Sequence, residues 1–129
     1  MATDEDNARD VGRLLAEHRA EGVVLLDVGE HSGWTDWFVI ATVAGVTQLR
    51  ALTRHVDEFA VLRGLSFRGG ANIADDEEWV LLDLGNVVVH LMSARAREFY
   101  DLEKLWFQAR SEKVDAPGPS KAPAGAAPG

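Results

Sequence analysis

Two apolar runs separated by a glycine–asparagine pair constrain the fold more than any other part of this sequence. The runs are residues 79–84, WVLLDL, and residues 87–92, VVVHLM, and Gly85 and Asn86 lie between them. A two-residue linker of this kind between β-forming runs predicts an antiparallel hairpin. Because side chains alternate along a strand, one face of the hairpin is purely aliphatic, and we expect it to be buried.

The opposite face of this hairpin mixes aromatic, charged and aliphatic side chains. Trp79, Asp83 and His90 lie on it, and the register set by the turn puts Asp83 diagonally opposite His90, within reach of it. No serine, cysteine or second acid is placed to complete a catalytic set with this pair. A structural hydrogen bond between the two side chains is therefore favoured over a catalytic one.

The rest of the chain alternates between helical and strand patterns. Apolar residues at helical spacing predict helices over residues 5–20, led by Thr3 or Asp4 as cap, and from about Gly45 to Gly64. Short β-branched runs predict strands over residues 23–28 and 37–43, with a weaker strand over residues 65–69. Together with the hairpin, this order predicts one α/β domain, with a mixed sheet of about five strands flanked by helices.

The C-terminal end has a different composition. Residues 111–129 hold all four prolines of the chain and few side chains that could pack. Such a composition cannot offset the entropy cost of ordering. The sequence therefore predicts a folded domain over residues 1–110 and a disordered Pro/Ala/Gly-rich tail over residues 111–129.

Composition excludes several classes of function. The chain has 129 residues, no cysteine and a formal net charge of −8. Negative charge disfavours direct binding to nucleic acid and is compatible with a basic protein partner. The absence of cysteine removes disulfides, thiolate metal sites and a cysteine nucleophile. No apolar run is long enough to span a membrane, and the acidic N-terminus is unlike a secretory signal. We expect a cytoplasmic protein.

The segment REFYDLEKLW, residues 97–106, has two different faces when read as one helix. Phe99, Leu102 and Leu105 recur at helical spacing and are expected to form a lid on the core. The second face carries Arg97, Glu98 and Tyr100. Aromatic and arginine side chains within a polar rim are typical of interface hot spots, so this face is expected to contact a partner.

No motif for metal or cofactor binding is recognisable. The acidic run at residues 75–78 consists of adjacent carboxylates, which point in alternating directions on an extended loop, whereas a calcium loop spaces its ligands and includes glycine. The glycines do not form a dinucleotide or phosphate loop, and no Gly-x-Ser-x-Gly elbow is present. The sequence predicts no cofactor, no metal and no catalytic residue.

Five motifs in order resemble the ribosomal silencing factor family, also called Iojap-like, over about residues 5–107. They are Asp27-Val28, TDWFVIAT from Thr35, Gln48 with the following LRAL, WVLLDLGNVVVHL from Trp79, and REFYDLEKLW from Arg97. Two positions depart from the family pattern. Asn86 stands where the family usually has aspartate, and Gly45 stands where it usually has a serine cap.

The resemblance implies a nucleotidyltransferase-like fold without the transferase activity. Active enzymes of that fold need paired carboxylates for magnesium, whereas the matching region here has Asp36 followed by the aromatic pair Trp37 and Phe38. Family members are understood to bind the large ribosomal subunit through ribosomal protein L fourteen. They thereby block subunit joining and repress translation when nutrients are short. The resemblance also suggests a homodimer that hides the binding face.

The residues expected to contact the partner combine the second hairpin face with the outer face of the closing segment. They are Trp79, Asp83, His90, Arg97, Glu98 and Tyr100. Two alternatives remain open at this stage. One is a degenerate nucleotidyltransferase-fold protein with residual nucleotide binding, and the other is an interaction module that acts away from the ribosome.

Overall fold

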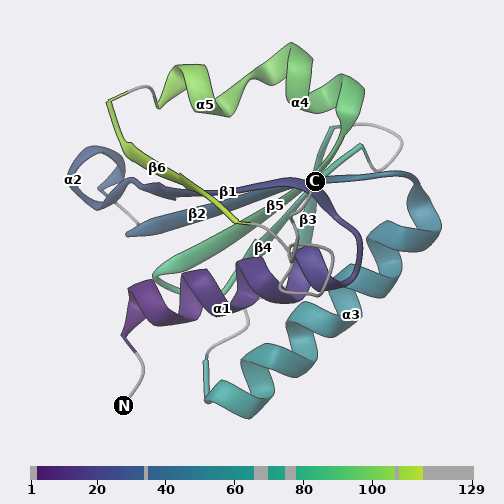
Figure 1. Cartoon of the computed structure of the whole chain (residues 1–129), viewed down its shortest axis with the longest axis horizontal. Coiled ribbons are helices and arrows are strands. Elements are labelled where there is room, and N and C mark those ends of the chain that lie inside the picture. The colour runs from purple at the N-terminus through teal and green to yellow at the C-terminus, as the bar shows by residue number, and fades with distance from the viewer. Residues whose placement is uncertain (1–2, 34, 66–69, 75–77, 107, 115–129) are drawn as a thin grey trace, which may run out of the picture.

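The computed structural model describes residues 3–33, 35–65, 70–74, 78–106 and 108–114. Its helices and strands alternate along the chain, and Figure 1 shows their arrangement. The helices are α1 (Asp4–Glu17), α2 (Gly29–Ser32), α3 (Val46–Arg63), α4 (Ala94–Tyr100) and α5 (Leu102–Leu105). The strands are β1 (Glu21–Asp27), β2 (Trp37–Val43), β3 (Gly70–Ala74), β4 (Trp79–Asp83), β5 (Val87–Ser93) and β6 (Arg110–Lys113).

The strands form one mixed sheet in the order β3-β4-β5-β2-β1-β6. Strands β2 and β5 are parallel, and the other neighbouring pairs are antiparallel. Both central strands are buried along nearly their whole length, as expected for strands that are covered on both faces. The expected single α/β domain with a mixed sheet is confirmed, and the sheet has six strands in place of about five.

Helices cover both faces of this sheet, so the molecule has three layers (Figure 1). Helices α1 and α3 lie on one face and bury the larger core, which includes Val11, Leu15, Leu52 and Val56. Helices α4 and α5 lie on the other face over a smaller core that includes Phe38 and the side chains of Ala96 and Leu102. The second face is less fully covered, because α4 and α5 are short.

Local sequence explains the two long helices. Thr3 accepts a hydrogen bond from the Asp6 N–H, and the Asp6 side chain accepts one from the Thr3 N–H, which makes a capping box at the start of α1. Helix α3 ends at Gly64, whose φ of +68° is the left-handed conformation that glycine adopts without strain. Both boundaries agree with the sequence-based expectation.

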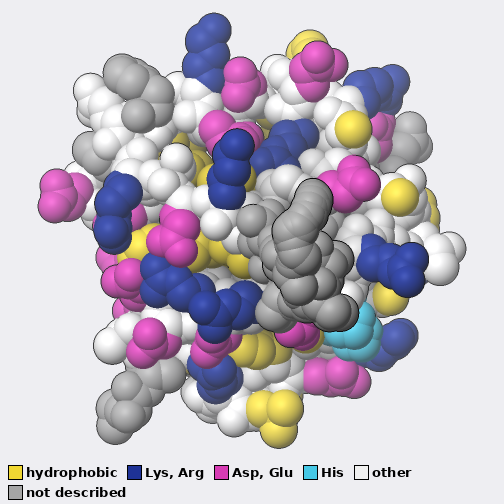
Figure 2. Space-filling view, viewed as in Figure 1, with side chains coloured by type: hydrophobic (Ala, Val, Ile, Leu, Met, Phe, Trp, Pro, Cys, Tyr) yellow, Lys and Arg dark blue, Asp and Glu magenta, His cyan; other side chains and the backbone are white. Residues whose placement is uncertain are grey.

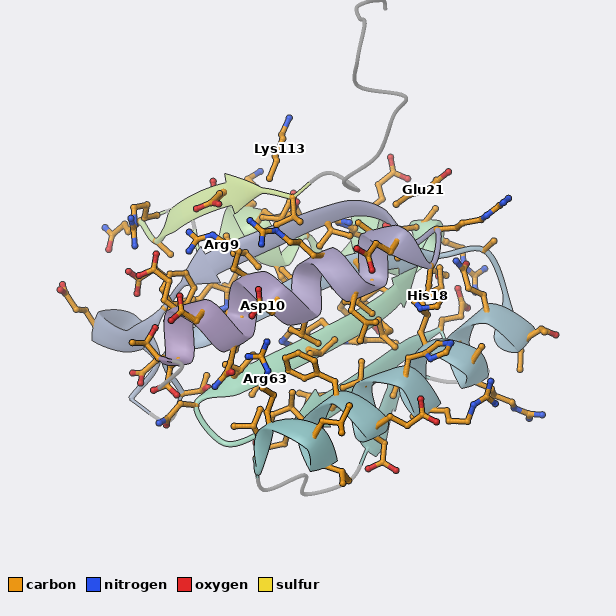
Figure 3. All side chains as sticks on the ribbon, turned by 60° about the horizontal axis from the view of Figure 1, so that its bottom comes forward. Arg9, Asp10, His18, Glu21, Arg63 and Lys113 are labelled. Carbon is orange, nitrogen blue, oxygen red and sulfur yellow. The ribbon has the colours of Figure 1, made fainter. Side chains whose placement is uncertain are left out.

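An ion pair and a hydrogen bond from one arginine join α1 and α3. Arg63 reaches from α3 toward α1, where it donates to Asn7 at 2.7 Å and to Asp10 at 2.5 Å (Figure 3). On the face seen in Figure 2, basic and acidic side chains are intermixed and do not form a field of one sign. In the part of the chain that the structure describes, no helix has the length and apolar character needed to cross a membrane.

The hairpin prediction is confirmed in its register. Val80 pairs with Leu91 and Leu82 pairs with Val89, and the Leu84 N–H donates to the Val87 carbonyl at 2.9 Å across the turn. The aliphatic face of these strands lies in the larger core against α1 and α3. The turn residues and the alternation along the strands were therefore sufficient to place this element.

The C-terminal boundary was predicted wrongly. Residues 110–113 form strand β6, which pairs antiparallel with β1, so the folded chain continues beyond residue 110. Arg9 on α1 holds this strand through two contacts with the Glu112 carboxylate, at 2.7 and 3.2 Å. The structure has a strand at Gly70–Ala74, directly after the strand predicted over residues 65–69. Most of that predicted strand, and residues 115–129 of the predicted tail, lie outside the described residues.

Candidate functional site

The hairpin and the closing segment meet on the sheet face covered by α4 and α5. Trp79 lies half-buried at the start of β4 and donates from Nε1 to Nδ1 of His90 at 3.0 Å. The Trp79 ring also contacts the Tyr100 ring, with 4.7 Å between centroids. The structure therefore brings Trp79 and Tyr100 together as expected, and it joins both to the interior through His90.

His90 itself does not reach the surface. Its side chain is 3% exposed and packs edge-to-face against Phe38, with ring centroids 4.6 Å apart. Burial lowers the pKa of His90 to about 4, because the charged imidazolium would lose its hydration there. The ring is therefore neutral at physiological pH, and the bond from Trp79 to Nδ1 places its proton on Nε2. The expectation that His90 contacts a partner directly is corrected to a supporting role beneath Trp79.

Asp83 lies where the sequence placed it, but its hydrogen bond is a different one. It pairs with Val88 across the hairpin, and His90 pairs with Leu81, so Asp83 and His90 are diagonal neighbours. The Asp83 carboxylate accepts from the Gly85 N–H at 2.8 Å, and Trp79 occupies the His90 Nδ1 atom. Asp83 is half-buried and stabilises the turn, in which Gly85 has a φ of +94°.

The closing segment is two short helices and not the single helix that was expected. Asp101 interrupts it with a φ of +47°, and its side chain accepts from the Lys104 N–H at 3.3 Å as the cap of α5. This change of direction rotates the residues that follow it. Leu102 is buried as predicted, whereas Phe99 and Leu105 are 78% and 68% exposed. The prediction that Phe99 and Leu105 close the core is therefore wrong.

The side chain of Arg97 turns inward, against the expectation that it contacts a partner. It is 15% exposed and makes a two-pronged contact with the Glu103 carboxylate, at 2.9 and 3.3 Å. Its Nη1 atom donates to the Thr42 hydroxyl on β2 at 3.0 Å. The sequence did not indicate these two partners. Glu103 is six residues from Arg97, and positions six apart do not face each other on one helix. Thr42 lies on a different element.

Side chains that remain exposed on α4 and α5, together with the half-buried Trp79, form what we call the α4–α5 surface. It consists of Trp79, Glu98, Phe99, Tyr100 and Leu105. The Phe99 and Tyr100 rings meet edge-to-face with centroids 4.9 Å apart, and the Tyr100 ring contacts that of Trp79. Phe99, Tyr100 and Trp79 therefore form a continuous row of three aromatic rings. Exposed aromatic groups that pack against one another before binding lose little entropy on contact with a partner.

The described residues offer no arrangement suited to metal chemistry. No group of three or more histidine, cysteine or acidic side chains among them could hold a metal ion. A hollow of about 470 Å³ lies at the ends of β2 and β5, and Glu21 is the one acidic residue that lines it. Residues 75–77 of the acidic run lie outside the described residues.

Comparisons with known proteins identify the family. The family model described as ribosomal silencing factor during starvation matches residues 1–128. The ribosomal silencing factor of Treponema pallidum is 44% identical over 101 residues, which are 77% of this chain and 88% of that protein. The ribosomal silencing factor of Bacillus subtilis is 34% identical over 99 residues, or 77% and 83% of the two chains. A crystal structure of a Chromobacterium violaceum protein, 26% identical, matches 93% of this chain and 98% of its own with a TM-score of 0.74. This chain therefore belongs to the ribosomal silencing factor family.

Proposed function

We propose that this protein binds the large ribosomal subunit through the α4–α5 surface and blocks joining of the small subunit. Membership of the ribosomal silencing factor family supports the partner, and the resemblance of the sequence motifs suggests ribosomal protein L fourteen as the point of contact. The mechanism is steric. It requires affinity for the large subunit and a binding position that overlaps the site where the small subunit joins, but no catalysis. The protein acts in the cytoplasm, where it represses translation.

The observation that carries this proposal is the row of exposed aromatic rings on α4. Phe99 is 78% exposed and Tyr100 43%, although both are large side chains that burial in a partner would stabilise. The charged side chains around them carry both signs: Glu98 and Arg95 are exposed on α4 and Lys104 on α5, and Asp83 lies on the same face of β4 as Trp79. An apolar centre with a charged rim is typical of a protein interface, in which the rings supply apolar contact and the rim charges orient the partner.

The test is co-sedimentation of the purified protein with separated large subunits. Phe99→Ser should weaken binding by about thirtyfold, since hot-spot residues contribute about 2 kcal/mol or more. Leu62→Ser is the matched control, because Leu62 is 86% exposed on α3, on the opposite side of the sheet. It should bind as the unaltered protein does. Equal binding by both variants, or equal loss, would remove the α4–α5 surface from the proposal.

A second copy of the chain is the competing occupant of this surface. We propose that a homodimer, if it forms, buries the α4–α5 surface and therefore competes with the ribosome. Sedimentation equilibrium with and without Phe99→Ser tests this arrangement. A dimer that weakens with Phe99→Ser supports competition, and a dimer that is unaffected by it places the self-contact elsewhere.

A further inference from the structure

The guanidinium of Arg97 joins three separate parts of the fold. It starts from the last turn of α4 and binds Glu103 on α5 through Nε and Nη2, at 3.3 and 2.9 Å. Its Nη1 atom reaches the Thr42 hydroxyl on β2 at 3.0 Å and the Glu21 carbonyl of β1 at 3.5 Å. We call Arg97, Glu103, Thr42 and the Glu21 carbonyl the Arg97 clamp.

Strand β1 is shaped to admit this guanidinium. The register of β1 against β2 shifts between Glu21 and Val24, and Gly22 within the irregular stretch has a φ of +57°. A Cβ atom at Gly22 would lie 2.9 Å from Nη1 of Arg97, which is closer than side chains tolerate. The backbone conformation therefore favours glycine here, and any side chain at this position would push the Arg97 guanidinium out of its present place.

The helices that carry the exposed aromatic row contribute few buried side chains to the core. Helix α4 has seven residues and α5 has four, and helices this short are not stable by themselves in water. Ala96 and Leu102 are the buried side chains that these helices contribute to the smaller core, and Asp101 between the helices has a φ of +47°. Their orientation therefore depends also on polar contacts, which include the Arg97 clamp at one side of α4 and the ion pair of Arg95 with Glu78 at its start.

We infer that Arg97 is a positioning residue, which fixes the α4–α5 corner on the sheet so that Phe99 and Tyr100 are already arranged for the partner. The inference rests on the proposed function, since it concerns the same surface. A two-pronged contact between arginine and carboxylate sets orientation as well as distance, because both groups are planar. The clamp acts by raising the fraction of molecules whose surface is ready to bind.

This account predicts the same effect from lesions in three different elements. Without the clamp, about a tenth of the molecules would have the α4–α5 corner arranged for binding. The apparent affinity for large subunits would then fall about tenfold, although no contact residue is lost. Arg97→Ala, Glu103→Ala and Gly22→Ala should each reduce affinity for large subunits by about this factor. The double variant Arg97→Ala/Glu103→Ala should be no worse than either single one, because the two residues act as a unit.

Amide hydrogen exchange supplies the readout that does not depend on the ribosome. Each clamp variant should speed exchange in residues 99–105 at least tenfold while α1 and α3 keep their protection. Gly64→Ala is the matched control for Gly22→Ala, because Gly64 has a φ of +68° and open space around its Cβ position. It should leave exchange in residues 99–105 unchanged. Arg97→Lys, which keeps the charge but not the planar fork, should give an intermediate rate.

Three results would overturn the inference. The first is amide exchange in residues 99–105 that is unchanged in both Arg97→Lys and Glu103→Ala. The second is an equal loss of protection in every helix and strand. The third is a loss of affinity in the double variant that equals the sum of the two single losses. If the unaltered protein fails to bind large subunits, the proposed function falls. The exchange measurement then still decides whether Arg97 orders the corner.

Discussion

His90 makes the stability of this protein depend on pH in the range where histidine side chains ordinarily change charge. The imidazole is 3% exposed, and burial lowers its pKa from 6.5 to about 4. The unfolded chain therefore takes up a proton as the pH falls through 6.5, whereas the folded protein does not until the pH approaches 4. Stability is complete above pH 6.5 and is lost progressively between these two values.

The size of the effect follows from the two pKa values. At about 1.4 kcal/mol per pKa unit, the full loss is about 3 kcal/mol, of which about 2 kcal/mol falls between pH 7 and pH 5. The lowered carboxylate pKa values, those of Asp6, Glu78 and Glu112, belong to groups that ordinarily titrate at 3.8 or 4.5. Their stabilising effect is lost mainly below pH 5, and comparison with a variant at His90 separates its contribution from that of the other three histidines.

Urea unfolding at pH 7, 6 and 5, followed by tryptophan fluorescence, measures this free energy directly. His90→Asn is the control, because its amide oxygen can accept from Trp79 while the side chain does not titrate. The free energy of unfolding should fall by about 2 kcal/mol in the unaltered protein and by much less in the variant. A free energy of unfolding that is constant from pH 7 to pH 5, or an equal loss in the variant, would refute the assignment of a buried neutral imidazole.

Three further predictions concern stability and charge. Deleting residues 111–129 should lower the free energy of unfolding by about 2 kcal/mol, because it removes most of β6 and the contact of Glu112 with Arg9. The loss should appear as a lower urea midpoint. Deleting residues 116–129 should leave that midpoint unchanged. Trp79→Phe should destabilise the protein by about 1 kcal/mol in the same assay, because the buried Nδ1 of His90 loses its donor. An unchanged midpoint would contradict the hydrogen bond from Trp79 to His90. Asp83→Asn keeps an acceptor for the Gly85 N–H but loses the negative charge. It should therefore preserve the urea midpoint and weaken the salt-dependent association with large subunits. A variant that does not fold would show that the charge itself is structural.

The sequence located elements whose pattern is local. Gly85 and Asn86 between alternating apolar runs predict both the hairpin and its register, and Thr3 and Gly64 mark helix ends by their own chemistry. These features need no knowledge of distant residues. For the same reason the hairpin pairing and the two long helices agree with the structure.

The misplaced elements depend on contacts that sequence spacing does not reveal. Strand β6 has the polar sequence RSEK and owes its conformation to pairing with β1 and to Arg9, nearly the whole chain away. The break at Asp101 requires a left-handed backbone in a non-glycine residue, which helical periodicity conceals. The inward turn of Arg97 depends on Thr42 and on the space at Gly22. Candidate contact residues could therefore be named from sequence, but which of them are exposed could not.

The most direct test of the account is a subunit-joining assay with purified large and small subunits. Whole ribosomes are measured by sedimentation after the large subunits are incubated with the protein, with Phe99→Ser or with Leu62→Ser. The account predicts that the unaltered protein and Leu62→Ser prevent joining, and that Phe99→Ser requires about thirtyfold more protein for the same effect. Undiminished joining in the presence of saturating unaltered protein would contradict the central claim, as would equal potency of Phe99→Ser.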